Sequence, residues 1–180
     1  LLAGGWEGGD GCSKVSVHHP GGEEGVVGSR ETGGWIADEL DEVLAETPDS
    51  DYRYHLTCRR ILEAMNCAYR DAGRTRARYP VNYAYMNPSD MVGEGLCDGD
   101  TISIQSEHGE IHGTARAEPQ LRSGVISMTH MFGALLPADD ARVDGSFTGR
   151  LCSIEQHLQT INFMPRFSGI PVNISTTSSN

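Results

Sequence analysis

The residues from Thr57 to Arg60 could together bind an anion, because they stand where a predicted strand meets a predicted helix. The run YRYHL before them is β-like, and the segment from Arg59 to Arg70 spaces its apolar residues as a helix does. The first backbone N–H groups of a helix lack internal partners and attract anions, and arginine adds paired donors suited to phosphate. In the alternative interpretation Thr57 only caps the helix and the arginines are only solvated. The local sequence favours neither.

The distribution of charge favours a compact anion over a nucleic acid as the ligand. The net charge is −11, yet seven arginines and only two acids lie between Arg53 and Arg78. Just before them, between Glu23 and Asp51, ten acids accompany one arginine. Binding to a nucleic-acid backbone requires a broad basic face, which an acidic chain does not supply. Alternatively, most of these arginines are solvated or pair with the acidic segment before them.

The 180 residues fit one globular domain with an extension. Residues 1–50 are predicted to be a glycine-rich, acidic linker or fragment edge, because 11 of the 22 glycines lie in residues 1–34. One amphipathic packing helix is expected at residues 35–46, where Ile36, Leu40, Val43 and Leu44 share a face. A domain is predicted at residues 51–175, followed by a disordered tail at 176–180.

The location of the protein is predicted from what the sequence lacks. No apolar run approaches the ~20 residues of a membrane span, and the first residues do not resemble a signal peptide. The five cysteines form no C-x-x-C pair, which favours a reducing compartment. We therefore expect a cytoplasmic chain with neither a membrane nor a nucleic acid as partner.

The elements after residue 80 are short strands separated by turns. Residues 81–86 alternate as a strand, and Asn87, Pro88 and Asp90 predict a capped short helix that ends at Gly93. A C-D-G-D turn then leads into a hairpin centred on His108-Gly109, and another strand is expected at residues 124–128. This pattern predicts a mainly β fold with short helices, an α+β arrangement built on a barrel.

These motifs, in this order, resemble a known family. N-P-S-D-M, the helix stop G-E-G-L, D-G-D, the hairpin S-x-x-G and L-R-S-G-V-I-S-M-T-H-M-F-G follow one another at compact spacing. Together with the flanking YRYHLTCRRILEAMN and GRLCSIEQHLQTINFMPRFSGIPVNI, they resemble the C-terminal dinucleotide-binding domain of the dimethylsulfoxide-reductase-type molybdopterin oxidoreductases. The resemblance runs from Tyr52 to Ile174.

The resemblance implies a fold and a function. The fold would be a six-stranded double-psi β-barrel that binds molybdopterin guanine dinucleotide. Molybdenum or tungsten would be held by other domains or subunits of a formate dehydrogenase- or nitrate reductase-like oxidoreductase, which are the expected partners. The chain has no cysteine quartet for an iron–sulfur cluster, so by itself it is not expected to be catalytic or to bind the metal.

The resemblance also implies cofactor-binding residues, of which two groups flank the predicted elements. The strand-to-helix junction and the helix after it supply Leu56, Thr57, Arg59, Arg60 and Asn66. The loop after the strand at 124–128 supplies His130, a hydrogen-bonding side chain, and Gly133, which permits close backbone approach. Asn162, in TINFMPRFSG, is the last candidate. The alternatives to cofactor binding are a surface amide at Asn66 and a structural role for His130.

Two other functions remain open. The first is a noncatalytic double-psi barrel for protein interaction or substrate recognition, as in the N-domains of chaperone-type ATPases. The second is a self-cleaving decarboxylase of the aspartate decarboxylase type, for which Gly28-Ser29 and Gly145-Ser146 are the only Gly-Ser bonds. Metal binding by the seven histidines has little support, because only His108 and His112 are regularly spaced.

Overall fold

The computed structural model describes residues 15–16, 26–27, 36–38, 40–41, 44–45, 51–133, 145–156, 158–159 and 162–177. The chain divides into two compact units. The first contains Leu1–Pro48 and Gln159–Phe163, and the second contains Asp49–Leu158 and Met164–Asn180. Each unit is described separately below.

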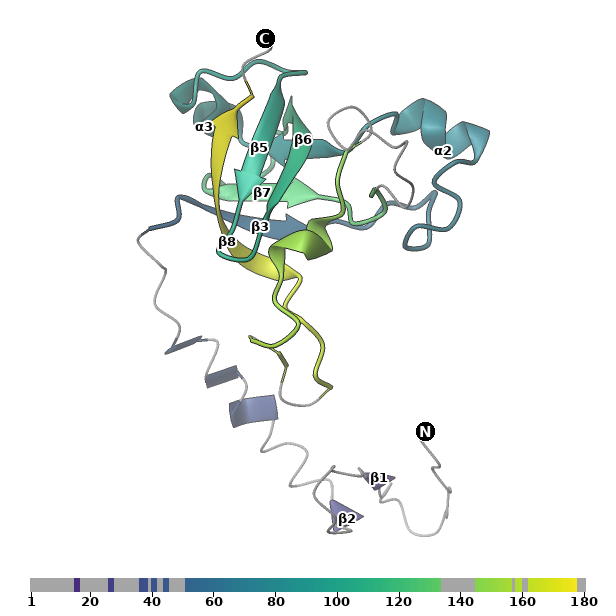
Figure 1. Cartoon of the computed structure of the whole chain (residues 1–180), viewed down its shortest axis with the longest axis vertical. Coiled ribbons are helices and arrows are strands. Elements are labelled where there is room, and N and C mark those ends of the chain that lie inside the picture. The colour runs from purple at the N-terminus through teal and green to yellow at the C-terminus, as the bar shows by residue number, and fades with distance from the viewer. Residues whose placement is uncertain are drawn as a thin grey trace. The chain divides into compact units, whose positions relative to one another are not determined.

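The second unit is a closed barrel of six strands, joined in the order β3-β7-β4-β6-β5-β8 (Figure 1). The strands are β3 (Tyr54–Cys58), β4 (Tyr83–Met86), β5 (Thr101–Gln105), β6 (Glu110–Ala117), β7 (Val125–Met128) and β8 (Ser168–Thr176). Two pairs are parallel, β3 with β7 and β4 with β6, and the remaining neighbours are antiparallel. The helices described between these strands are all short, so the predicted fold class, a mainly β double-psi barrel, is confirmed.

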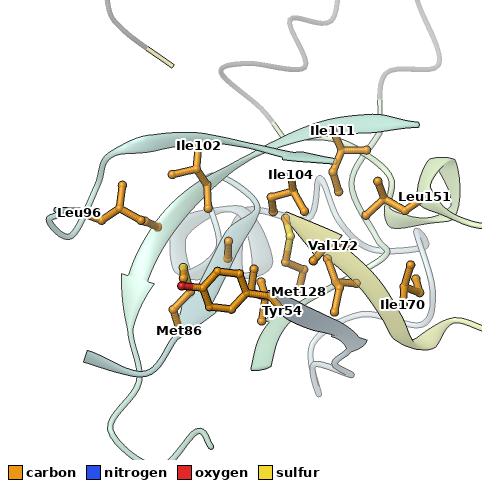
Figure 2. Packing of buried hydrophobic residues seen from close by; sticks show 14 of the residues in the cluster. Tyr54, Met86, Leu96, Ile102, Ile104, Ile111, Met128, Leu151, Ile170 and Val172 are labelled. Carbon is orange, nitrogen blue, oxygen red and sulfur yellow. The ribbon is translucent and has the colours of Figure 1, made fainter. Parts of the chain in front are cut away.

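Alternation along the strands places apolar side chains inside the barrel. In β3, Tyr54 and Leu56 are buried whereas His55 and Thr57 are only half-buried, and β4 repeats the pattern with Ala84 and Met86. Figure 2 shows how these side chains pack against those of the other strands. The labelled core residues are Tyr54, Met86, Leu96, Ile102, Ile104, Ile111, Met128, Leu151, Ile170 and Val172.

The short helix and the hairpin after β4 follow the sequence-based prediction closely. Helix α3 (Pro88–Gly93) begins after Asn87, whose side chain accepts a hydrogen bond from the backbone N–H of Ser89. Strands β5 and β6 pair in antiparallel register from Thr101↔Thr114 to Gln105↔Glu110, which confirms the hairpin. Local signals suffice here because caps and tight turns are determined by near neighbours.

The predicted helix from Arg59 to Arg70 is wrong. Strand β3 continues to Cys58, and residues 59–72 form turns in which Met65 and Ala68 exchange backbone hydrogen bonds of 3.2 and 3.0 Å. Asn66 and Tyr69 have φ values of 54° and 68°, which a right-handed helix cannot contain. The helix α2 instead spans Gly73–Arg78 (Figure 1). The helix N-terminus proposed as an anion site at Thr57–Arg60 therefore does not exist.

The predicted tail begins too early. Strand β8 continues through Thr176, and Thr177 donates its hydroxyl to the backbone oxygen of Thr101 at 2.7 Å. Residues 178–180 lie outside the described residues.

The first unit contains two short strands that the sequence did not predict, β1 (Val15–Ser16) and β2 (Val26–Val27), which pair in antiparallel fashion. Residues 36–38, 40–41 and 44–45 are helical, within the range predicted for the amphipathic helix. The side chains of Ile36, Leu40 and Leu44 are 56, 55 and 72% exposed, so the predicted packing of this face is not observed.

No helix among the described residues has both the length and the apolar character that crossing a bilayer requires.

Candidate functional site

The candidate site begins where the parallel strands β3 and β7 end together. Cys58 is paired with Met128, and the backbone N–H of Arg59 donates to the Met128 oxygen at 2.8 Å. The residues that follow the two strands are thus brought side by side, although some seventy positions separate them in the sequence. Arg59 and Arg60 leave β3 at the point where Thr129 and His130 leave β7.

Three of the predicted site residues contact one another beyond these strand ends. The Arg60 Nη1 donates to the Asn66 side-chain oxygen at 2.9 Å, and the His130 Nε2 lies 3.1 Å from the same oxygen. Because a carboxamide oxygen only accepts hydrogen bonds, the His130 Nε2 carries the proton and the Nδ1 of the neutral ring is an acceptor. We call Arg60, Asn66 and His130 the strand-end cluster.

The turn at Met65–Ala68 places Asn66 for this role. Asn66 has a positive φ of 54°, a conformation that asparagine tolerates better than most residues. The tight reversal projects the carboxamide toward the strand ends, where it links Arg60 to His130. The sequence placed Asn66 on a helix, whereas it lies in a turn, and its role in binding the cofactor stays a prediction.

His130 is kept largely neutral by its surroundings. Burial lowers the pKa of its imidazole below the ordinary value of 6.5, and the positive charge of Arg60 lowers the pKa further. A second positive charge beside Arg60 is unfavourable until an anion arrives to offset both. The cluster thus combines one permanent cation with a ring that can gain charge.

Arg59 has a different partner from Arg60. Its Cζ atom lies 3.8 Å from the ring centroid of Tyr85, which belongs to β4. Arg59 therefore does not join the strand-end cluster through any hydrogen bond that the structure shows among the described residues. It is held by the aromatic ring on the outer wall of the barrel.

Leu56 and Thr57 lie within β3, before the cluster. The side chain of Leu56 is fully buried in the core, so only its backbone could meet a ligand. The Thr57 hydroxyl donates to the Ser168 hydroxyl of β8 at 3.2 Å, which ties two strands together. Their roles in cofactor binding stay predictions.

Gly133 follows His130 by three positions and has its own structural reason for being glycine. Its φ is 145°, and a Cβ there would approach the Phe147 Cβ to 2.9 Å. The Arg70 Nη1 contacts the Gly133 oxygen at 3.4 Å, so Arg70 is a site neighbour that sequence reasoning did not single out. Only its membership of the arginine-rich segment could have indicated it.

Asn162 belongs to the first unit and is exposed, so its proposed role alongside the other residues stays a prediction.

Two thiols, Cys58 and Cys152, are protonated at neutral pH. Burial raises the pKa of Cys58, and burial together with the neighbouring Cys58 raises the pKa of Cys152 to about 11. Both side chains therefore remain protonated thiols. Within the described part of the chain, no three histidine, cysteine or acidic side chains come together as metal ligands would.

Arg59 and Arg60 differ in their pairing from the arginines later in the same connection between β3 and β4. Asp71 pairs with Arg70 and Arg76, and Glu63 pairs with Arg78. In contrast, no carboxylate among the described residues lies within 4.0 Å of Arg59 or Arg60. The two arginines at the end of β3 keep their charge available for an anionic ligand.

Comparisons with known proteins bear on the family and the fold. A family model described as "Molydopterin dinucleotide binding domain" matches residues 54–167, more than half of the chain. Among solved structures, the chain is similar to acetylene hydratase from Pelobacter acetylenicus, with 20% sequence identity and a TM-score of 0.57. That match covers 76% of this chain and 19% of the other, so the chain spans about a fifth of the length of the protein it resembles. The likeness shows a shared fold.

Proposed function

Because the chain belongs to the molybdopterin dinucleotide-binding domain family, we propose that its strand-end cluster holds the guanine form of that dinucleotide within a larger molybdenum or tungsten oxidoreductase. The observation that carries this proposal is the convergence of Arg60 and His130 on the side-chain oxygen of Asn66. The family membership itself confirms the resemblance found in the sequence.

The chemistry of the cluster fits a diphosphate. A guanidinium without a carboxylate partner among the described residues offers paired, charge-assisted N–H donors. Burial and, second, the charge of Arg60 lower the pKa of the imidazole, and an approaching anion would oppose both effects, so the ring can take up a proton when the ligand binds. Asn66 holds the Arg60 and His130 side chains close together, because its side-chain oxygen contacts both.

The bound cofactor would supply the dithiolene that ligates the metal, and the chain's own residues would only hold and orient it. Arg60 would neutralise phosphate charge. His130 would donate a hydrogen bond and, when protonated, would add a positive charge. The main-chain groups after β3 and β7 would fix the distance between these donors. The redox step would take place in other domains or subunits, so this chain alone would not be catalytic.

The partners of the domain would be those other domains or subunits, in the cytoplasm. In the turns after β3, Leu62 is fully exposed, and Met65 and Tyr69 are 66 and 68% exposed. Apolar side chains gathered in one segment favour contact with another protein surface. The same observation favours the second candidate function, a barrel used only for protein interaction, over the decarboxylase.

The proposal is tested by titrating the whole chain with guanosine diphosphate in a calorimeter at low salt, with cytidine diphosphate as the base control. We expect tighter binding of the guanine nucleotide. Replacing Arg60 by alanine should weaken binding about 10- to 100-fold, the loss expected for one charge-assisted hydrogen bond of ~1.5–3 kcal/mol. His130→Ala should weaken binding less.

A matched control is Arg122→Ala. Arg122 is exposed and precedes β7, whereas His130 follows it, so this variant removes the same charge at the opposite end of the strand. If Arg60→Ala and Arg122→Ala have equal effects, binding depends only on overall charge and the site assignment is wrong. If the nucleotide does not bind while the chain captures proteins, the interaction module is the better description.

A further inference from the structure

The outer face of β4 carries two tyrosines that each support an arginine, and one of these arginines leaves β3 next to the strand-end cluster. We propose that Tyr85 is a positioning residue, which holds the guanidinium of Arg59 ready for the diphosphate of the cofactor. The inference rests on the proposed function and adds a second fixed cation to it.

The strand register brings Tyr85 within reach of Arg59. Thr57 of β3 pairs with Ser127 of β7, and Ser127 pairs with Tyr85 of β4, so the three residues lie level across adjacent strands. Leu56 and Ala84 are buried in the core, so their neighbours Thr57 and Tyr85 face away from it, and Ser127 between them is only 4% exposed. Arg59 follows two residues after Thr57, and its side chain extends across β7 to the Tyr85 ring.

Both ends of Arg59 are fixed. Its backbone N–H is bonded to the Met128 oxygen at 2.8 Å, and its Cζ lies 3.8 Å from the Tyr85 ring centroid. An arginine free in solution samples many rotamers, and ordering them opposes binding. The ring removes part of this cost before a ligand arrives.

The aromatic ring restrains the guanidinium without neutralising it. A carboxylate would satisfy both the charge and the in-plane N–H donors, whereas a ring attracts the cation through its face only. The described residues provide no carboxylate within 4.0 Å of Arg59. The edge of the guanidinium therefore keeps its donors and its charge for an anion.

The neighbouring pair provides a control within the same strand. Arg116 of β6 lies over Tyr83, with its Cζ 4.6 Å from the ring centroid, and the two tyrosine rings are 5.9 Å apart in an edge-to-face arrangement. Arg116 is within a strand, whereas Arg59 begins the loop that carries Asn66. Only the Tyr85 pair should affect binding at the strand-end cluster.

The experiment measures the affinity of the whole chain for guanosine diphosphate in the variants Tyr85→Leu, Tyr85→Phe and Tyr83→Leu. We expect Tyr85→Leu to weaken binding about two- to fivefold, the range of an exposed cation–π contact. Tyr85→Phe keeps the ring and should bind as the wild type does, and Tyr83→Leu should also leave the affinity unchanged. In an Arg59→Ala background, Tyr85→Leu should have no further effect.

A second measurement reports the geometry in the ligand-free protein. The NMR signal of the Arg59 Nε–H should be displaced by the ring current of Tyr85, retained in Tyr85→Phe and shifted toward its ordinary position in Tyr85→Leu. An unshifted signal in the wild type would overturn the inference. So would a binding loss for Tyr85→Leu that persists without Arg59.

Different results would reject the role of Tyr85 and the proposed function. If the wild type binds the nucleotide and Arg60→Ala weakens binding while Tyr85→Leu does not, the inference falls and the proposed function stands. If the wild type shows no binding, the proposed function fails, and the role of Tyr85 fails with it.

Discussion

The connection between β3 and β4 and the connection between β4 and β5 are built differently. The connection between β4 and β5 contains α3, and its polar side chains are occupied by the fold. Asn87 caps the helix, while the two Asp90 oxygens accept hydrogen bonds from the Ser123 hydroxyl at 2.6 Å and the Gly124 N–H at 2.8 Å. Met91 and Leu96 are buried in the core.

The connection between β3 and β4 leaves much more of its chemistry exposed. It contains two non-glycine residues with positive φ, Asn66 and Tyr69, and its Leu62 side chain is fully exposed. It also supplies Arg60 to the strand-end cluster. Departures from local rules are expected where residues serve a ligand or partner. In line with the proposed function, we therefore call the β4–β5 segment the scaffold connection and the β3–β4 segment the binding connection.

The largest expected difference comes from the same substitution in both connections. Leu96→Ala should destabilise the protein by about 2–5 kcal/mol, because the Leu96 side chain is only 6% exposed and its removal leaves a cavity in the core. Leu62→Ala should change stability by less than about 0.5 kcal/mol, since that side chain is fully exposed. Urea unfolding followed by circular dichroism measures both, and equal losses would contradict the distinction.

A smaller difference is expected between two aspartates. Asp90→Ala should cost about 1.5–3 kcal/mol, because it removes an acceptor that serves both a hydroxyl and a backbone N–H. Asp71→Ala removes only exposed ion pairs with Arg70 and Arg76, which contribute little. Its unfolding midpoint in urea should stay close to that of the wild type. A larger loss for Asp71→Ala would mean that the binding connection is also structurally essential.

The same contrast explains which elements could be predicted. The prediction of a short helix between β4 and β5 was correct, because Asn87, Pro88 and Asp90 act on residues within one helical turn. The prediction of a helix at residues 59–70 was wrong, although the apolar residues there have helical spacing. Pairing of Thr57 and Cys58 with β7 extends the strand, and those partners are some seventy residues away in the chain. Apolar periodicity contains no information about such pairing.

The family resemblance named the candidate residues, but the sequence could not give their arrangement. Arg60, Asn66 and His130 were each proposed through that resemblance, and the contacts of Arg60 and His130 with the Asn66 oxygen depend on the turn at Met65–Ala68. The partner of Arg59 was missed. Tyr85 reaches it only because β4 and β7 are neighbours in the barrel, a register that the alternating run VNYAYM does not reveal.

The smallest expected effect is a shift in one titration, and it tests the binding connection directly. Burial is the main cause that lowers the pKa of His130, and the charge of Arg60 is the second. Arg60→Ala should therefore raise this pKa toward 6.5 without reaching it, whereas Arg70→Ala, which removes a charge that does not act on His130, should leave it unchanged. An NMR titration of the His130 Cε1–H signal measures all three proteins.

The sign of the accompanying pH effect follows from the same shift. The unfolded chain protonates His130 near pH 6.5, while the folded chain does so only at a lower pH, so below 6.5 the unfolded state binds more protons. Stability should therefore decline as the pH falls from 6.5 to the folded-state pKa, and this contribution should be constant outside that window. Arg60→Ala should make the decline smaller. Should the variant lose stability more steeply than the wild type over this range, the charge of Arg60 is not what keeps the imidazole neutral, and the two side chains do not act as one cluster.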